Sequence, residues 1–375
     1  MRSSYSEDDV ILLLKDITGM VEPQGTEERE RQIQSGRHYS EMLPIEYIPS
    51  GEYMEAYRSA LEHFSAPTAR AVGVLAEKII RERGSRVVLV SLARAGIPAG
   101  ILLKRYLRSG YGIDVPHYSI SIIRGRGIDE NAVRWLLQRY AAKDLLFVDG
   151  WIGKGAIQKE LEKSVKPYAG LSPELAVLAD PAGITGLCGT HEDLLIPSSC
   201  LNCTVSGLIS RTFLRDDIIG KDDFHGAVYY GEMRDADLSY DFIRHIEEKF
   251  VFPGERQEGN ETVSADGRKA DEIADSHDGN SLTQTEDSGY GIDEVREIAR
   301  RFQIGDINLI KPGIGEATRV LLRRVPWKIL VNIKSKDDIS LDHLIRLAGE
   351  KNVPVEYYPL VHYKACGIIR RLADA

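Results

Sequence analysis

The stretch RVVLVSLARAGIPAGILLKRY, residues 86–106, determines the fold class of this 375-residue chain. Residues 86–92 are rich in valine and leucine and predict a buried strand, and residues 98–106 have helical spacing. A second stretch, DLLFVDGWIGKGAIQKELEKSV at residues 144–165, repeats the order of strand, glycine turn and helix. This order is typical of an α/β protein with a parallel sheet, in which ligands bind at the carboxyl ends of the strands.

Helical and strand patterns continue on both sides of these two units. We expect helices at residues 53–64, 68–83, 155–165, 292–302, 315–324 and 341–351, and strands at 328–333 and 353–358. The later elements form a compact group, so the sequence predicts a second, small α/β domain at residues 290–375 after a larger domain at residues 1–252.

Residues 253–289 separate these two domains. They carry ten acidic and three basic residues and hold only three large apolar side chains, so we expect a flexible, disordered acidic linker. The whole chain has 48 basic and 57 acidic residues, a net charge of −9, of which the linker accounts for −7. Residues 293–375 instead carry a net charge of +4. This distribution favours a local nucleic-acid site in that segment, and it argues against non-specific attraction of nucleic acid to the whole protein.

The sequence also predicts where the protein works. The first residues, MRSSYSEDDVILLLKDI, contain only five consecutive apolar residues, too few for a signal peptide, and no stretch reaches the 18 apolar residues of a membrane helix. We therefore expect a cytoplasmic protein with no membrane partner. In that compartment its four cysteines favour packing, reactivity or metal binding over disulfides.

The two glycine turns predict an anion site. Backbone N–H groups and a basic side chain at such turns bind phosphate, while a carboxylate at the strand end holds sugar hydroxyls or magnesium. The candidate phosphate ligands are Arg94, Ala95, Gly96, Gly153, Lys154, Gly155 and Ala156, with Asp149 as the carboxylate. Arg124 and Arg126 flank a glycine in the intervening HYSISIIRGRGIDENA, residues 117–132, and suit closure over a polyanion. The alternative is that the glycines only turn the chain and the arginines are solvated.

The motifs VSLARAG and LLFVDGWIGKGA resemble the two phosphate loops of type I phosphoribosyltransferases. Asp149 matches the first acidic residue of that family's second loop, whereas Gly150 replaces the second acid. Together with GRHYSEMLPIEYIPS and PSSCLNCTVSGLISRT, these motifs more closely resemble the StiP family of stress and tellurite-resistance gene clusters. That family is described both as phosphoribosyltransferase-like and as a cysteine protease.

The transferase resemblance implies an enzyme of nucleotide-type metabolism that binds phosphoribosyl diphosphate, or a related sugar phosphate, with Mg²⁺ held through the diphosphate. Asp149, Lys154 and Arg124 are then the catalytic residues, acting by position and charge. This is the function that we expect, coupled to RNA recognition. Two alternatives are a cysteine peptidase and a non-catalytic, nucleotide-sensing RNA-binding regulator.

The peptidase alternative uses Cys200 as nucleophile with His191 or His225 as base and Asp193 or Asp223 as orienting carboxylate. The spacing Cys188-Gly-Thr-His191 and Cys200-Leu-Asn-Cys203 also suits zinc, although burial as small apolar residues is the simpler interpretation. We expect no resident metal, and we place Cys366 in an amphipathic C-terminal helix.

The basic C-terminal segment KPGIGEATRVLLRRVPWKILVNIKSKDD, residues 311–338, places two glycines before a helix with several arginines. With the later GEKNVPVEYYPLVHYKACG it resembles the Pelota-type RNA-binding domain. The resemblance implies binding of structured RNA. The implied contact residues are Gly313, Gly315, Glu316, Thr318, Arg319 and Arg323. The alternative is an ordinary solvated helix face.

Overall fold

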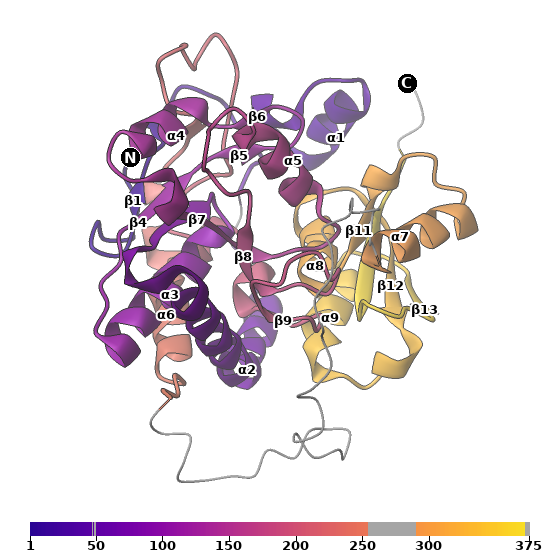
Figure 1. The fold of residues 1–375 in the computed structure, drawn as a ribbon. Helices are drawn as coiled ribbons and strands as arrows, with labels where there is room; N and C mark the ends of the chain where they lie inside the picture. Colours follow the sequence, from indigo (N-terminus) through magenta and orange to yellow (C-terminus); the bar gives the residue numbers. More distant parts are fainter. Residues whose placement is uncertain (47, 49, 254–289, 372–375) are drawn as a thin grey trace.

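The computed structural model describes residues 1–46, 48, 50–253 and 290–371. The linker that the sequence predicts at residues 253–289 therefore lies, apart from Pro253, outside the described residues, and the domain boundaries stay predictions. Two larger sheets, of six and four strands, and the helices that cover them form most of the described part (Figure 1).

The N-terminal sheet has six strands that are all parallel, which confirms the α/β class. Their order is β1 (Ile11–Leu12), β4 (His117–Ile120), β3 (Val88–Leu92), β7 (Leu145–Trp151), β8 (Leu175–Ala179) and β9 (Cys188–Thr190). Every residue of β3 is buried, as expected for a central parallel strand with helices on both faces.

Helices cover both faces of this sheet (Figure 1). One side holds α2 (Gly51–Arg83), α3 (Gly96–Tyr111) and α6 (Ser239–Glu247); the other holds α4 (Glu130–Leu137) and α5 (Ala156–Val165). Successive side chains of β3 point to opposite faces of the sheet, so Leu89 packs with the first group of helices and Val90 with the second. Shorter elements complete this part: α1 (Thr26–Gln34), the pair β2 (Lys15–Asp16) and β10 (Gly226–Ala227), and the hairpin β5 (Ile122–Ile123) and β6 (Gly127–Ile128).

The expected break between two N-terminal helices was wrong. The predicted helices at 53–64 and 68–83 are one 33-residue helix, α2, with Pro67 inside it. Leu61, Ala69 and Val72 lie in one buried cluster on both sides of the proline, and this packing outweighs the cost of proline in a helix.

The C-terminal sheet has the order β11 (Ile310–Pro312), β14 (Ala365–Ile369), β12 (Pro326–Asn332) and β13 (Val355–Tyr358). Strand β14 runs antiparallel to both neighbours, and β12 and β13 are parallel. Helix α7 (Tyr290–Arg301) covers one face, while α8 (Ile314–Arg323) and α9 (Asp342–Glu350) cover the other. Cys366 lies on β14, so its placement in a helix was wrong; all five residues of β14 are buried because the strand is central and covered on both faces.

The two parts share a continuous apolar interior. Ile314, Ala317 and Leu344, from α8 and α9, belong to the same buried cluster as Tyr57 and Leu75 of α2. The face of the C-terminal sheet that carries α8 is therefore turned toward the N-terminal part. Within the part of the chain that the structure describes, no helix is both long and apolar enough to cross a bilayer.

Candidate functional site

A cavity of about 1020 Å³ lies between the two parts of the chain. The turn after β7 lines one side, and α8 with β11 lines the other. Asp149 and Lys154, the centre of the predicted phosphate site, therefore face Glu316, Arg319 and Arg323 of the predicted RNA site. The structure thus brings together two groups of residues that the sequence assigns to separate sites.

The turn after β3 is a packing element. The Arg94 guanidinium is buried, donates a 2.6 Å hydrogen bond to the Ile209 carbonyl and pairs with Glu46 at 3.3 Å. A Cβ on Gly96 would lie 2.4 Å from the Val148 carbonyl oxygen, so glycine permits the close approach of α3 to β7. Ala95 lines the cavity, but Arg94 points elsewhere and is held by its own partners.

The turn after β7 joins the two parts of the chain. The Lys154 ammonium donates to the carbonyls of Ile307 and Ile310 at 2.7 and 3.0 Å, and Tyr363 Oη donates to the Gly153 carbonyl at 2.7 Å. Burial lowers the pKa of Lys154 to about 8 and raises that of Asp149 to about 7. Gly155, with φ of +76°, caps α5 and lines the cavity with Ala156. Lys154 is therefore a tether between domains in this conformation.

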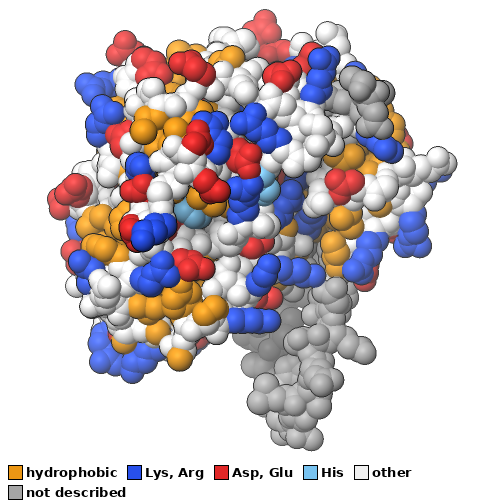
Figure 2. Space-filling model, turned by 90° about the horizontal axis from the view of Figure 1, so that it is seen from above, with side chains coloured by type: hydrophobic (Ala, Val, Ile, Leu, Met, Phe, Trp, Pro, Cys, Tyr) orange, Lys and Arg blue, Asp and Glu red, His pale blue; other side chains and the backbone are white. Residues whose placement is uncertain are grey.

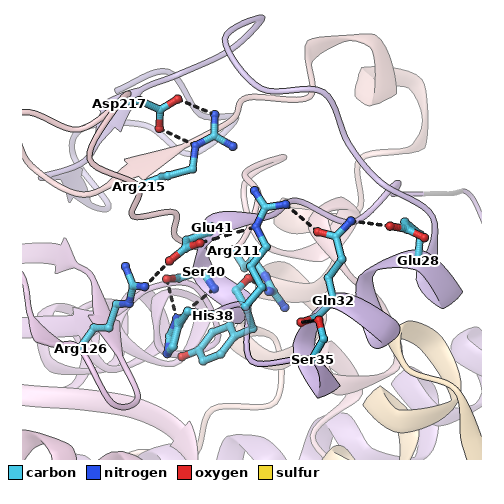
Figure 3. Close-up of polar contacts among 12 residues, drawn as sticks. Glu28, Gln32, Ser35, His38, Ser40, Glu41, Arg126, Arg211, Arg215 and Asp217 are labelled. Carbon is cyan, nitrogen blue, oxygen red and sulfur yellow. Dashed lines mark hydrogen bonds and ion pairs between the residues drawn. The ribbon is translucent and has the colours of Figure 1, made fainter. Parts of the chain in front are cut away.

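The two loop arginines differ in their surroundings. Arg124 lines the cavity and donates to the Asn308 side chain at 3.1 Å. Arg126 instead pairs with Glu41, in a polar network near His38 and Ser40 (Figure 3). Arg124 is therefore placed at the cavity, whereas Arg126 is held in a surface ion pair.

Arg211, a cavity residue that the sequence interpretation did not single out, comes from the loop before β10. Its guanidinium donates to the Tyr39 carbonyl and lies 5.0 Å from the centre of the Tyr39 ring. No local motif marks this arginine, because the contact joins residues 172 positions apart. Only the folded chain places it in the wall of the same cavity as Arg124.

The predicted RNA-binding residues on and beside α8 face the N-terminal part. The carboxylate of Asp193 accepts from the Ile314 N–H at 3.0 Å and from the Lys364 N–H at 2.9 Å, and so caps the N-terminus of α8. Thr318 is fully buried and bonds to His343 at 2.8 Å. Thr318 is therefore a packing residue here.

Arg319 and Arg323 lie at the cavity side of α8. Arg319 stacks 4.3 Å from the centre of the Trp151 ring and lies 3.4 Å from Glu316, while Arg323 donates to the Asn202 side chain. Burial acts to raise the pKa of Glu316, but the charges of Arg319 and other cations outweigh it and leave the pKa below its usual value.

Three of the four cysteines are remote from a base. Cys200, Cys203 and Cys366 are buried, and burial raises the pKa of each thiol to about 12. Cys203 contacts the Met233 sulfur. Among the described residues, no histidine bonds to Cys200, and no group of three or more His, Cys, Asp and Glu side chains is placed to hold a metal ion.

Cys188 and His191 are in contact at β9, the edge strand of the N-terminal sheet. The His191 Nε2 lies 3.4 Å from the Cys188 Sγ, and Nδ1 lies 3.0 Å from the backbone oxygen of Asp180. Since a carbonyl oxygen only accepts, this contact places the ring proton on Nδ1 and leaves Nε2 to receive the thiol proton. The pair therefore has the geometry of a nucleophile with its base.

The Asp180 carboxylate completes the cluster. Asp180 follows β8, and its Oδ2 lies 3.8 Å from the His191 Nδ1. The same oxygen accepts from the N–H groups of Ile184 and Thr185, which fixes the carboxylate beside the ring. Burial raises the pKa of Cys188, while the nearby Lys78 lowers it; Lys78 also anchors β9 by donating to the Cys188 carbonyl at 2.9 Å. The sequence interpretation named His191 as a candidate base for Cys200, and Cys188 and His191 as candidate zinc ligands, but it did not pair Cys188 with His191 in catalysis and gave no sign of Asp180.

The fold and this cluster define an α/β protein with a cysteine–histidine pair on a parallel sheet, joined to a small α/β domain. Residues 3–247 match the family model "Tellurite-like stress resistance cysteine protease StiP", and residues 290–371 match the PELOTA RNA binding domain. The chain belongs to the StiP family, as its sequence motifs predicted. A protein named "Cysteine protease StiP" from Acinetobacter baylyi is 34% identical over 381 residues, covering 98% of this chain and 94% of that protein.

These matches correct the expected function. The phosphoribosyltransferase interpretation is wrong, because the family model and the relative are both named as cysteine proteases, which favours the peptidase alternative. The geometry gives physical reasons for the error. Arg94 and Lys154 are held by protein carbonyls, and Gly150 supplies no second carboxylate. The Pelota match supports the RNA-binding part of the prediction.

Proposed function

We propose that this chain is a cysteine peptidase that carries an RNA-recognition domain, with Cys188 as the nucleophile, His191 as the base and Asp180 as the orienting residue. The observation that carries the assignment is the 3.4 Å contact between the Cys188 Sγ and the His191 Nε2, with Nδ1 directed at Asp180. The names of the family and of the relative support the reaction class. A stress-related role and a cytoplasmic location belong to the same proposal.

The reaction follows from these positions. His191 Nε2 takes the thiol proton as the sulfur attacks the peptide carbonyl carbon, and then gives that proton to the leaving amine as the C–N bond breaks. Water, deprotonated by the same nitrogen, hydrolyses the resulting thioester and restores the thiol. The neighbouring Asp180 carboxylate stabilises the imidazolium that forms between these steps.

In this conformation the substrate cannot reach the Cys188 thiol. The Cys188 side chain is fully buried, while the His191 side chain is 58% exposed. A substrate therefore reaches the sulfur only when the loop that follows β9 shifts. Asp193, in the same loop, is bonded to α8 and Lys364, so the C-terminal domain holds this loop in place.

The test compares matched serine variants of the purified full chain on a fluorogenic peptide library. We expect Cys188→Ser to lower peptide hydrolysis by about a thousandfold or more, and His191→Gln to lower it comparably, because these residues act as one unit. Cys200→Ser is the matched control and should keep the wild-type rate. Loss of hydrolysis in Cys200→Ser alone would refute the assignment of the nucleophile. Full hydrolysis by a chain with all four cysteines replaced would refute the peptidase class.

A further inference from the structure

We propose that a single strand of RNA binds in the cavity between the two domains, with its phosphates held by arginine and lysine side chains from both of them. This inference rests on the RNA-recognition part of the proposed function. It adds the location of the strand and the contribution of the N-terminal domain, which neither family match assigns.

The first argument is that the start of α8 is closed to RNA in this conformation. A Cβ on Gly315 would lie 2.9 Å from the Trp151 ring and 3.3 Å from the Ser199 Cβ, so the N-terminal domain is in contact with this turn. The Asp193 carboxylate accepts from the Ile314 N–H at the helix start through both of its oxygens. RNA therefore meets α8 through the residues that line the cavity, which are Glu316, Arg319, Val320 and Arg323.

The second argument is the charge of the cavity wall. Nine arginine and lysine side chains line it, against four carboxylates, and these cations come from both domains. Arg124 and Arg211 are among those from the N-terminal part; Lys311 and Arg323 are among those from the C-terminal part. Figure 2 shows Lys and Arg side chains near the middle of one face of the molecule, with Asp and Glu side chains among them. A cleft lined by one sign of charge concentrates ligands of the opposite sign.

The third argument is that several of these cations have donors left over. Among the described residues, the buried Nε atoms of Arg211 and Arg319 have no hydrogen-bond partner. Burial and the neighbouring positive charges lower the pKa of Arg211 to about 9, and burial lowers that of Lys311 to about 7. A phosphate in the cavity supplies the missing acceptors and relieves the repulsion among the cations.

The fourth argument concerns the bases. The cavity wall also carries Tyr39, Trp151, Phe302 and Trp327, and Trp327 is 36% exposed. Aromatic faces beside a basic groove are what single-stranded RNA uses, since unpaired bases stack on them while the backbone follows the cations. The volume of about 1020 Å³ lies just above the ~300–1,000 Å³ range for small-molecule pockets, which suits a short run of nucleotides. An acidic peptide would use the cations but would leave the rings unstacked.

The experiment measures fluorescence anisotropy of a labelled 12-nucleotide RNA of mixed sequence with the full chain, over a range of salt concentrations. The key variants are Arg124→Ala from the N-terminal side and Arg323→Ala from the C-terminal side. We expect each to weaken binding severalfold for every RNA sequence, and to lower the slope of log K against log salt by about one, as the loss of a phosphate contact does. Arg124→Lys, which keeps the charge, should restore most of the affinity.

Matched controls are Arg300→Ala and Lys221→Ala, exposed cations that do not line the cavity; both should bind as the wild type does. Wild-type affinity in Arg124→Ala with weakened binding in Arg323→Ala would overturn the shared site and leave RNA on the C-terminal domain alone. Displacement of RNA by poly-glutamate at equal charge concentration would overturn it in favour of an acidic peptide. Absence of RNA binding by the wild type at low salt would instead refute the RNA-recognition part of the proposed function, and leave the peptidase assignment standing.

Discussion

Replacing Asp193 by alanine removes the carboxylate that joins the loop after His191 to the C-terminal domain. Its oxygens accept from the Ile314 N–H at 3.0 and 3.2 Å and from the Lys364 N–H at 2.9 Å. In the variant both N–H groups lose their acceptor, at about 1–3 kcal/mol each, or roughly 2–6 kcal/mol together. We therefore expect a weaker contact between the loop and α8.

A second effect of the same substitution opposes the first. Burial raises the pKa of Asp193 from 3.8 to about 6, so holding the ionised carboxylate here at pH 7.5 costs about 3 kcal/mol relative to water. Alanine has no such cost. The difference between the two effects runs from a gain of about 1 kcal/mol to a loss of about 3 kcal/mol, so we expect Asp193→Ala to lower the free energy of unfolding by roughly 1 kcal/mol at pH 7.5.

The assay is urea unfolding followed by tryptophan emission, because Trp151 lies between Arg319 and Gly315 at the contact between domains. Hydrogen exchange of the Ile314 amide gives a local measurement and should be faster in the variant. Asp222→Ala is the matched control, since the Asp222 side chain is 89% exposed. A change below about 0.5 kcal/mol with unchanged exchange at Ile314 would refute the reasoning.

Two further predictions concern the same contact. Gly315→Ala should lower the free energy of unfolding by about 1–3 kcal/mol, because its Cβ meets the Trp151 ring, whereas Gly349→Ala, in open space on α9, should be neutral or stabilise by about 0.5–1 kcal/mol; equal effects in thermal denaturation would contradict this. Burial raises the pKa of Asp149 to about 7, so its contribution to stability is present below pH 4 and is lost as the pH rises to 7. The free energy of unfolding of the wild type should therefore fall between pH 5 and 8, and in Asp149→Asn this fall should be smaller by about 1–2 kcal/mol, after allowance for solvent in the cavity. If the two pH profiles are parallel, burial of the Asp149 carboxylate does not control the pH dependence of stability.

Much of the fold could be predicted from local patterns. The expected strand at 86–92 is β3, and the expected helix at 155–165 is α5, because buried parallel strands and amphipathic helices leave strong periodic signals. Cys366 is an instructive failure. The run of small and apolar residues around Cys366 fits either a buried strand or a buried helix. Only the pairing of this run with β11 and β12 in the folded chain shows that it is a strand.

The candidate site was harder to predict from the sequence than the fold. The Cys188-Gly-Thr-His191 spacing was visible, but the spacing suits zinc as well as a reactive thiol. The distinction depends on Asp180, which orients the ring from the end of the neighbouring strand through contacts that no sequence pattern encodes. Arg94 and Lys154 show the opposite difficulty, since their residue types suit phosphate but the fold places each beside a distant backbone carbonyl that accepts its hydrogen bond.

The short loop after β9 connects the two proposed activities. His191 contacts Cys188 at one end of this loop, and Asp193, two residues later, caps the helix that lines the RNA cavity. A strand of RNA that pulls α8 away from Trp151 must also weaken the bonds to Asp193, because both contacts belong to the first turns of the same helix. Releasing Asp193 frees the loop whose shift uncovers the buried thiol. RNA in the cavity is therefore expected to raise the rate at which Cys188 reacts, and this coupling must disappear in Asp193→Ala, where the loop is already released.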